Sequence, residues 1–196
     1  MRRKAGDPCS NCCKAIPSVL KFTAAPLIYL RILDLEAELG VSTEPHKETL
    51  DRLIEEAGRT IQVKGTYTRE DAVGILRTID NVIRSNGLNL RSVDGNDLFH
   101  KGLGSKKVDC DDTSFIYLSI ADALGLPLAA VSAPQHIFAR FMFNNRSYIN
   151  WETTSAEVLS NDYYLKNLTR DGIIATAYNN RGKAWTRKGN LIGAGG

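Results

Sequence analysis

The chain has 196 residues, a length that suits one domain with a short appendage, and 43% of them are hydrophobic. Its formal net charge of +3 indicates no particular partner, and no basic run is interleaved with aromatic residues, so nucleic-acid binding is not expected. No apolar stretch approaches the roughly 20 residues that would span a bilayer. We therefore expect a globular protein with no membrane span. A cytoplasmic location is predicted, with export as the open alternative.

The first 25 residues are predicted to form a leader without stable structure. The basic start followed by apolar residues is weakly typical of an export signal, but charged residues and prolines interrupt the apolar run. Cys9, Cys12 and Cys13 fall here in the pattern CSNCC, which is half of a zinc site. Since no second cysteine pair follows and the three histidines are distant, we predict free thiols and no metal or other cofactor.

Helical spacing of apolar residues predicts three amphipathic helices in the first half of the chain. They extend from Pro26 to Gly40, from Pro45 to Gly58 and from Thr68 to Gly87, and each final glycine is expected to close its helix. Thr68 and Asp71 resemble a capping box, with Asp in place of the usual Glu.

The period of the apolar pattern changes in the second half of the chain. A helix starting at Cys110 should stop at Gly125, and strands should follow over LAAVSAP, HIFARFMF and SYINWE, the last two as an antiparallel hairpin. Helices are then expected over AEVLSNDYYLKNL and TRDGIIATAYNNRGKAWTRKG. Several helices, a small sheet and further helices in this order predict the α+β class.

Cys110 precedes the helix DDTSFIYLSIADAL, whose apolar residues predict a largely buried element. Free N–H groups at a helix start favour the thiolate over the thiol. However, Asp109, Asp111 and Asp112 favour the thiol, so the dipole alone would not activate the sulfur and an imidazolium partner is needed. These aspartates are interpreted as helix caps and dipole partners rather than as a cation site.

His136 is the natural partner because it begins the strand HIFARF, whereas His46 is expected in an early helix and His100 in a loop. A catalytic base also needs a group that orients its ring. Glu152 lies 16 residues later on the next strand, and Asn150, with the same parity, is the substitute. The alternative interpretation is that His136 and Glu152 are polar hairpin residues paired on the surface.

The blocks DCDDTSFIYLSIADALGLPL, APQHIFARF and INWETT resemble the core of the transglutaminase-like superfamily of papain-type cysteine enzymes, in particular bacterial proteins that also contain tetratricopeptide repeats. The resemblance covers about fifty residues. It implies that Cys110 is the nucleophile, His136 the general base and acid, and Glu152 the orienting residue, although Asp is usual at the third position. It also implies a cysteine-bearing helix packed on a small antiparallel sheet.

The segment AYNNRGKAWTRKGN resembles the first helix of a tetratricopeptide repeat, with Tyr178, Gly182, Trp185 and Gly189 at the repeat's aromatic and glycine positions. A lone repeat helix cannot bury its own face. Either it docks on the main domain, or the chain is shortened relative to its relatives. We thus divide the chain into the leader (1–25), a transglutaminase-like domain (26–168) and a partial repeat helix with a tail (169–196).

The predicted function is attack of a thiolate on an amide or peptide carbonyl, with the thioester resolved by water (a hydrolase) or by an amine (an acyl transferase). The substrate would be a peptide or protein. The backbone N–H of Cys110 would stabilise the oxyanion, and Asn96 and Gln135 are candidate side-chain donors. A non-catalytic interaction module that binds a protein partner through the repeat-like helix is the alternative, and metal binding through CSNCC is a third hypothesis.

Overall fold

The computed structural model describes residues 27–90, 97–160 and 166–187, and the predicted leader with its three cysteines lies outside these ranges. In chain order the described elements are α1 (Ile28–Ala37), α2 (Glu44–Thr60), α3 (Arg69–Ser85), β1 (Asn89–Leu90), α4 (Phe99–Ser105), β2 (Lys107–Val108), α5 (Cys110–Leu124), β3 (Leu128–Ala133), β4 (His136–Met142), β5 (Tyr148–Glu152), β6 (Glu157–Leu159) and α6 (Arg170–Arg187). This composition confirms the predicted α+β class. Within the described ranges, no helix is both long and apolar enough to cross a membrane.

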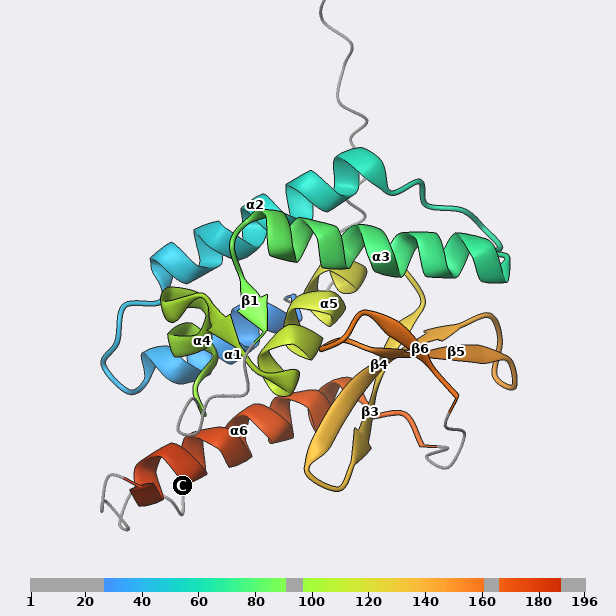
Figure 1. Ribbon diagram of the computed structural model, residues 1–196. Coiled ribbons are helices and arrows are strands. Elements are labelled where there is room, and N and C mark those ends of the chain that lie inside the picture. The colour runs from blue at the N-terminus through green and yellow to red at the C-terminus, as the bar shows by residue number, and fades with distance from the viewer. Residues whose placement is uncertain (1–26, 91–96, 161–165, 188–196) are drawn as a thin grey trace, which may run out of the picture.

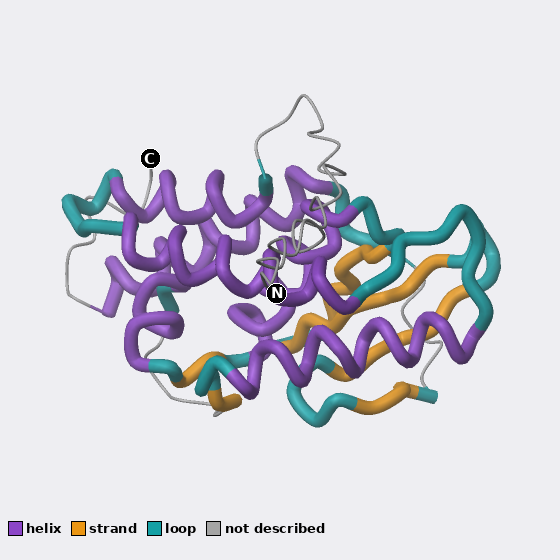
Figure 2. The backbone as a smooth tube through the Cα atoms, turned by 90° about the horizontal axis from the view of Figure 1, so that it is seen from above, coloured by secondary structure: helices purple, strands orange, loops and turns teal. Residues whose placement is uncertain are grey.

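Helix α5 is the central element of the fold. It contacts α1 and α2 on one side and β3 and β4 on the other, so it lies between a helical layer and the sheet (Figure 1). Its side chains are buried almost all round, and Phe115, Ile116 and Leu118 are each no more than 3% exposed. A helix that is apolar on every side belongs in the core. Seen from above, most of the helices lie at one end of the molecule and the larger sheet at the other, with one long helix running beside the strands (Figure 2).

The sheet is an antiparallel meander in the order β3-β4-β5-β6. The predicted hairpin is confirmed, because Ala139 lies opposite Trp151 and Phe141 opposite Ile149 in the β4–β5 pair. Residues with large apolar side chains on both strands are buried, and Trp151 donates its indole N–H to the hydroxyl of Tyr117 in α5 at 3.1 Å. The sheet therefore packs directly on the helix that begins with Cys110.

The start of α3 is the predicted capping box. Thr68 Oγ1 accepts the backbone N–H of Asp71 at 3.1 Å, and Asp71 Oδ2 accepts the backbone N–H of Thr68 at 3.0 Å. Asp thus replaces Glu without loss of either bond. Gly87, which follows the helix, has φ +77°, a conformation that glycine adopts without a steric penalty.

The prediction that Gly58 ends the second helix is wrong, because α2 continues to Thr60. A Cβ atom at Gly58 would lie 3.2 Å from Cδ2 of Leu124 in α5. Glycine at this position therefore permits a close approach of α2 to α5, and its role is in packing rather than termination.

The helix predicted over residues 156–168 is also wrong where the structure describes it, because Glu157–Leu159 forms strand β6 on the edge of β5, while residues 161–165 lie outside the described ranges. Ala156 has φ +58°, which is incompatible with a helix starting there, and its N–H donates to the carbonyl of Glu152 at 2.9 Å. Pairing with β5 gives this segment hydrogen bonds to the rest of the sheet. These tertiary contacts override the local helical propensity.

The described residues between α3 and α5 form short elements that the sequence pattern did not predict. Strands β1 and β2 pair in parallel, and His100, expected in a loop, lies in α4. The reason is Glu36, a buried residue of α1 that accepts the N–H groups of Phe99 and His100 at 2.6 and 2.8 Å and contacts His100 Nδ1 at 2.8 Å. A carboxylate from a distant helix thus caps this short helix.

We expect Glu36→Ala to lower the free energy of unfolding by about 2–4 kcal/mol, because two backbone N–H groups and one imidazole lose their acceptor in a buried environment. Chemical denaturation followed by circular dichroism measures this change. Glu38→Ala is the control: Glu38 is exposed and pairs with Arg181 at 2.7 Å, so its loss should cost about 1 kcal/mol or less. Equal effects of the two substitutions would contradict the capping role of Glu36.

Candidate active site

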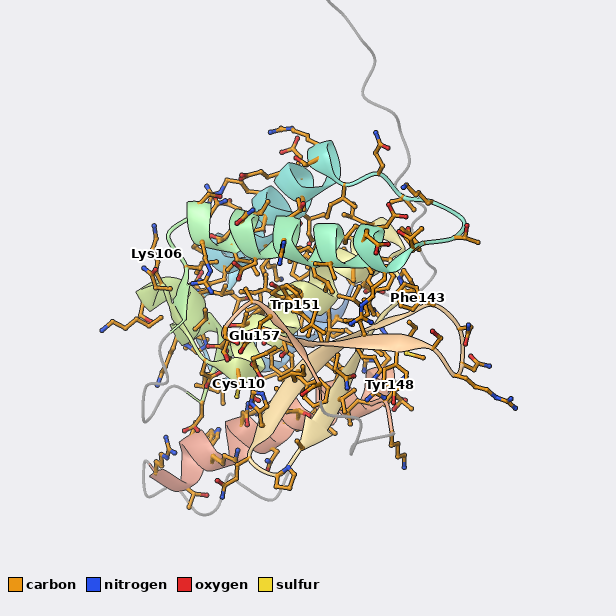
Figure 3. All side chains as sticks on the ribbon, turned by 45° about the vertical axis from the view of Figure 1, so that its right-hand side comes forward. Lys106, Cys110, Phe143, Tyr148, Trp151 and Glu157 are labelled. Carbon is orange, nitrogen blue, oxygen red and sulfur yellow. The ribbon has the colours of Figure 1, made fainter. Side chains whose placement is uncertain are left out.

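Cys110 is the first residue of α5 and is half-buried (Figure 3). The helix begins here because Asp109 is its N-cap: Asp109 Oδ1 accepts the backbone N–H of Asp112 at 3.0 Å, as the cap interpretation predicted. The Asp109 carbonyl also accepts the hydroxyl of Thr113 at 2.7 Å. The sulfur therefore lies at a firmly capped helix start.

His136 begins β4 and Glu152 ends β5, and their side chains form the predicted pair. The distance from His136 Nε2 to Glu152 Oε2 is 2.6 Å. Extending the β4–β5 register by one residue pair sets Glu152 opposite Phe138, so His136 is its diagonal neighbour on the same face. The His136 side chain is 32% exposed and that of Glu152 is 13% exposed, so the pair is more sheltered than a surface ion pair.

This pairing determines which ring nitrogen of His136 is available for chemistry. A carboxylate can only accept hydrogen bonds, so the proton of the neutral ring lies on Nε2. Nδ1 is then the nitrogen that can exchange a proton with another group. The arrangement matches a base whose ring is oriented by an acid.

Asn150, the substitute for Glu152, has a different role. It is 2% exposed, and its Oδ1 accepts a hydrogen bond from Nε of Arg140 at 2.7 Å. The guanidinium group of Arg140 also lies 4.0 Å from the ring centre of Tyr148. Asn150 thus belongs to a buried network two residue pairs further along the hairpin, and Glu152 is the residue beside His136.

The sulfur lies beside the strand that bears His136. The backbone N–H of Ile137, the residue after His136, lowers the pKa of the Cys110 thiol and so lies on the side of the strand near the sulfur. One turn into α5, Ser114 Oγ donates to the carbonyl of Ile137 at 3.3 Å and lies 3.2 Å from the hydroxyl of Thr153. These contacts bring the helix start, the start of β4 and the end of β5 together.

The resting state of Cys110 is a thiol. Burial is the largest cause, and the charges of Asp111 and Asp109 add to it, so that the pKa of the Cys110 thiol rises to about 11. The N–H of Ile137 acts in the opposite direction but does not balance them. The sequence-based expectation that the helix dipole alone would not activate this cysteine agrees with this result.

The aspartates that follow Cys110 in α5 have different surroundings. Asp111 Oδ1 accepts a hydrogen bond from the Cys110 thiol, with 3.7 Å between sulfur and oxygen. Its Oδ2 accepts a hydrogen bond from the side-chain amide of Asn180 in α6 at 2.8 Å. Asp112 is 3% exposed, and burial together with the charge of Asp109 raises its pKa well above the usual range. Asp111 is therefore the carboxylate in direct contact with the nucleophile.

The remaining predicted residues can also be placed. Gln135 lies in the turn between β3 and β4, is exposed and has φ +58°, whereas Asn96 and the cysteines of CSNCC lie outside the described residues. In the part of the chain that the structure describes, no group of three or more His, Cys, Asp or Glu side chains is arranged to hold a metal ion.

Several contributors to the site were not predicted. Ser114 could have been found, since it lies four residues after Cys110 and so on the same helix face. Thr154 donates its N–H and hydroxyl to Glu152 Oε1, a local pattern that ETT makes available. No sequence pattern places Asn180 close to Cys110, because only the tertiary fold brings α6 to the site.

We expect Asp111→Asn to lower the pKa of the Cys110 thiol from about 11, because a negative charge next to the thiolate is removed. At a fixed pH below that pKa the variant contains more thiolate, although each thiolate is a weaker nucleophile. The net alkylation rate should rise about threefold for each unit by which the pKa falls. Alkylation by iodoacetamide, followed by mass spectrometry of the Cys110 peptide between pH 6 and 11, measures both quantities.

Asp171→Asn is the matched control for this titration, since Asp171 lies on the protein surface in an ion pair with Arg31. Its removal should leave the pKa of the thiol unchanged. A rate profile that moves to higher pH in Asp111→Asn, or that moves equally in both variants, would contradict the electrostatic account of the site.

The chain has no match among protein-family models, curated proteins or solved structures. The resemblance of its three sequence blocks to the transglutaminase-like superfamily therefore stays a prediction. Cys110, His136 and Glu152 are a candidate active site because His136 pairs with Glu152 and Ser114 joins the helix that begins with Cys110 to the neighbours of both residues.

Proposed function

We propose that this protein is a cysteine-dependent hydrolase or acyl transferase of the transglutaminase-like superfamily, acting on an amide or peptide carbonyl. The observation that supports this most is the 2.6 Å pair between His136 and Glu152, at strand ends that Ser114 connects to the helix beginning with Cys110. In this proposal Cys110 is the nucleophile, His136 the base and Glu152 the orienting acid, which are the three roles that acyl transfer requires.

The raised pKa of Cys110 determines how the proton must move. Because the resting sulfur is protonated, His136 acts as a general base: Nδ1 takes the thiol proton as the sulfur forms a bond to the carbonyl carbon. Glu152 stabilises the imidazolium that results. When the tetrahedral intermediate collapses, the imidazolium gives the proton to the departing amine or ammonia, and a thioester on Cys110 remains.

The oxyanion formed in this step needs hydrogen-bond donors. The backbone N–H of Cys110 is suited to this role, because the first N–H groups of a helix have no acceptor within the helix. The N–H of Ile137, which lowers the pKa of the Cys110 thiol, is a second candidate donor. Gln135 precedes His136 in an exposed turn and is the side-chain candidate among the described residues.

The second half of the reaction decides between the two activities. Water that enters the site and is activated by His136 hydrolyses the thioester, whereas a primary amine in the same place forms a new amide. In both cases the protein returns to the thiol and neutral imidazole. The substrate class is a peptide or protein that presents a carboxamide or peptide bond.

The second candidate function is a non-catalytic module that binds a protein partner through α6. This helix docks on α1 through buried residues including Ile173, Ile174 and Ala177, and leaves Tyr178 50% exposed. A surface hollow on α6 is lined by Tyr178 together with Gly182 and other residues of the same helix. Of the four positions that resemble a repeat helix, Gly189 lies outside the described residues.

We expect Cys110→Ala to abolish the release of amine from amide substrates and His136→Ala to lower kcat by about 10²–10⁴-fold, the range that general acid–base catalysis contributes. The assay uses a fluorogenic peptide-amide library for hydrolysis, and casein with dansylcadaverine for amine incorporation. Mass spectrometry of the acid-quenched protein should detect an acyl group on Cys110.

His46→Ala is the matched control, since His46 lies in α2 with its ring beside that of His100 and has no role in the proposed mechanism. It should retain the activity of the unaltered protein. Amine release that persists in Cys110→Ala would exclude the cysteine mechanism. Absence of turnover and of acyl adducts with both substrate sets would favour the interaction module.

A further inference from the structure

The two oxygens of the Glu152 carboxylate have different hydrogen-bond partners. Oε2 contacts His136 Nε2 at 2.6 Å, and Oε1 accepts two bonds from Thr154, from its hydroxyl at 2.7 Å and from its backbone N–H at 3.1 Å. Both oxygens are thus used, and the plane of the carboxylate is set by the residue two positions later in the chain.

Thr154 is itself held by the turn between β5 and β6. Ala156 N–H donates to the carbonyl of Glu152 at 2.9 Å, and Arg84 Nη2 lies 3.5 Å from the carbonyl of Thr154. The preceding residue, Thr153, is 1% exposed and contacts Ser114 of α5. The turn is therefore tied to α5 and α3, and the Thr154 hydroxyl has a defined place from which to donate.

A glutamate has one more rotatable bond than an aspartate, so its carboxylate needs additional contacts to stay in one orientation. Glu152 is the last residue of β5. The Thr154 hydroxyl is the closer of the two donors to Oε1, and it restricts the last torsion of the side chain through a charge-assisted bond.

We propose that Thr154 is a positioning residue: its hydroxyl fixes the Glu152 carboxylate so that His136 keeps its proton on Nε2 and turns Nδ1 toward Cys110. The geometric part of this proposal concerns the resting protein. Its catalytic consequence rests on the proposed function, and the two parts are tested by different measurements.

The geometric part is tested by proton NMR of the full-length ¹⁵N-labelled chain without substrate. We expect a low-field, slowly exchanging Nε2 proton of His136, which broadens or disappears in Thr154→Val and is retained in Thr154→Ser. The second histidine–glutamate pair in the molecule, His100 Nδ1 with Glu36, provides an internal reference. It should keep its signal in every correctly folded variant.

Ser155→Ala is the matched control, because the Ser155 hydroxyl lies in the same turn but donates to Glu157 at 2.8 Å instead. It should leave the His136 signal unchanged. If Thr154→Val does not fold, as judged by the His100 signal, Thr154→Ala serves the same purpose. A His136 signal that persists in the folded Val or Ala variant, or that is lost equally in Ser155→Ala, would overturn the proposal.

The catalytic part is tested with the amide substrates. Thr154→Val should lower kcat by about 10–100-fold, the size of effect that a misplacement of about 1 Å produces, and should change KM less than twofold. Thr154→Ser should restore kcat, and Ser155→Ala should keep it. A change confined to KM, or a fall in kcat in Thr154→Ser equal to that in Thr154→Val, would overturn the catalytic role. Absence of turnover in the unaltered protein would contradict the proposed function, and the NMR measurement would then test the geometry by itself.

Discussion

The contacts of Ser114 join the three elements that bear Cys110, His136 and Glu152. This buried hydroxyl connects α5 to the carbonyl of Ile137 and to the hydroxyl of Thr153, which are next to His136 and Glu152 in the chain. Because Cys110 lies one helical turn earlier on the same face, the sulfur is brought to the start of β4 by the same contacts that fasten the helix to the sheet. Packing and chemistry therefore depend on a single junction.

The electrostatics of this junction favour a protonated nucleophile. Thiol enzymes that form a thiolate–imidazolium pair at rest lower the pKa of the sulfur, whereas here burial and Asp111 raise it. The α6 residue Asn180 donates to Asp111 and so helps to keep that carboxylate beside the sulfur. A resting thiol resists adventitious oxidation and alkylation. Its proton must be removed during attack, so the reaction depends on the orientation of His136.

Much of this arrangement could be predicted from sequence, and the failures have physical causes. The start of α5, the β4–β5 hairpin and the His136–Glu152 pair follow from capping, from alternation and from strand parity, all of which are local. The helical pattern after Ala156 gave way to a strand because β5 offered an edge to pair with. Gly58 was misjudged as a helix end because its role depends on α5, which lies far away in the chain. The contributions of Glu36 and Asn180 likewise come from distant helices, and no local pattern indicates them.

The central claim is that one sulfur, one imidazole and one carboxylate act on the same carbonyl group. A crystal structure of the protein treated with a peptide aldehyde tests it most directly, since an aldehyde forms a hemithioacetal with a competent thiol. We predict a bond from the aldehyde carbon to Cys110, with His136 Nδ1 about 3 Å from the hemithioacetal and Nε2 still bound to Glu152. A crystal with Cys110 unmodified at saturating aldehyde, or with the ring of His136 turned away from the adduct, would contradict the claim.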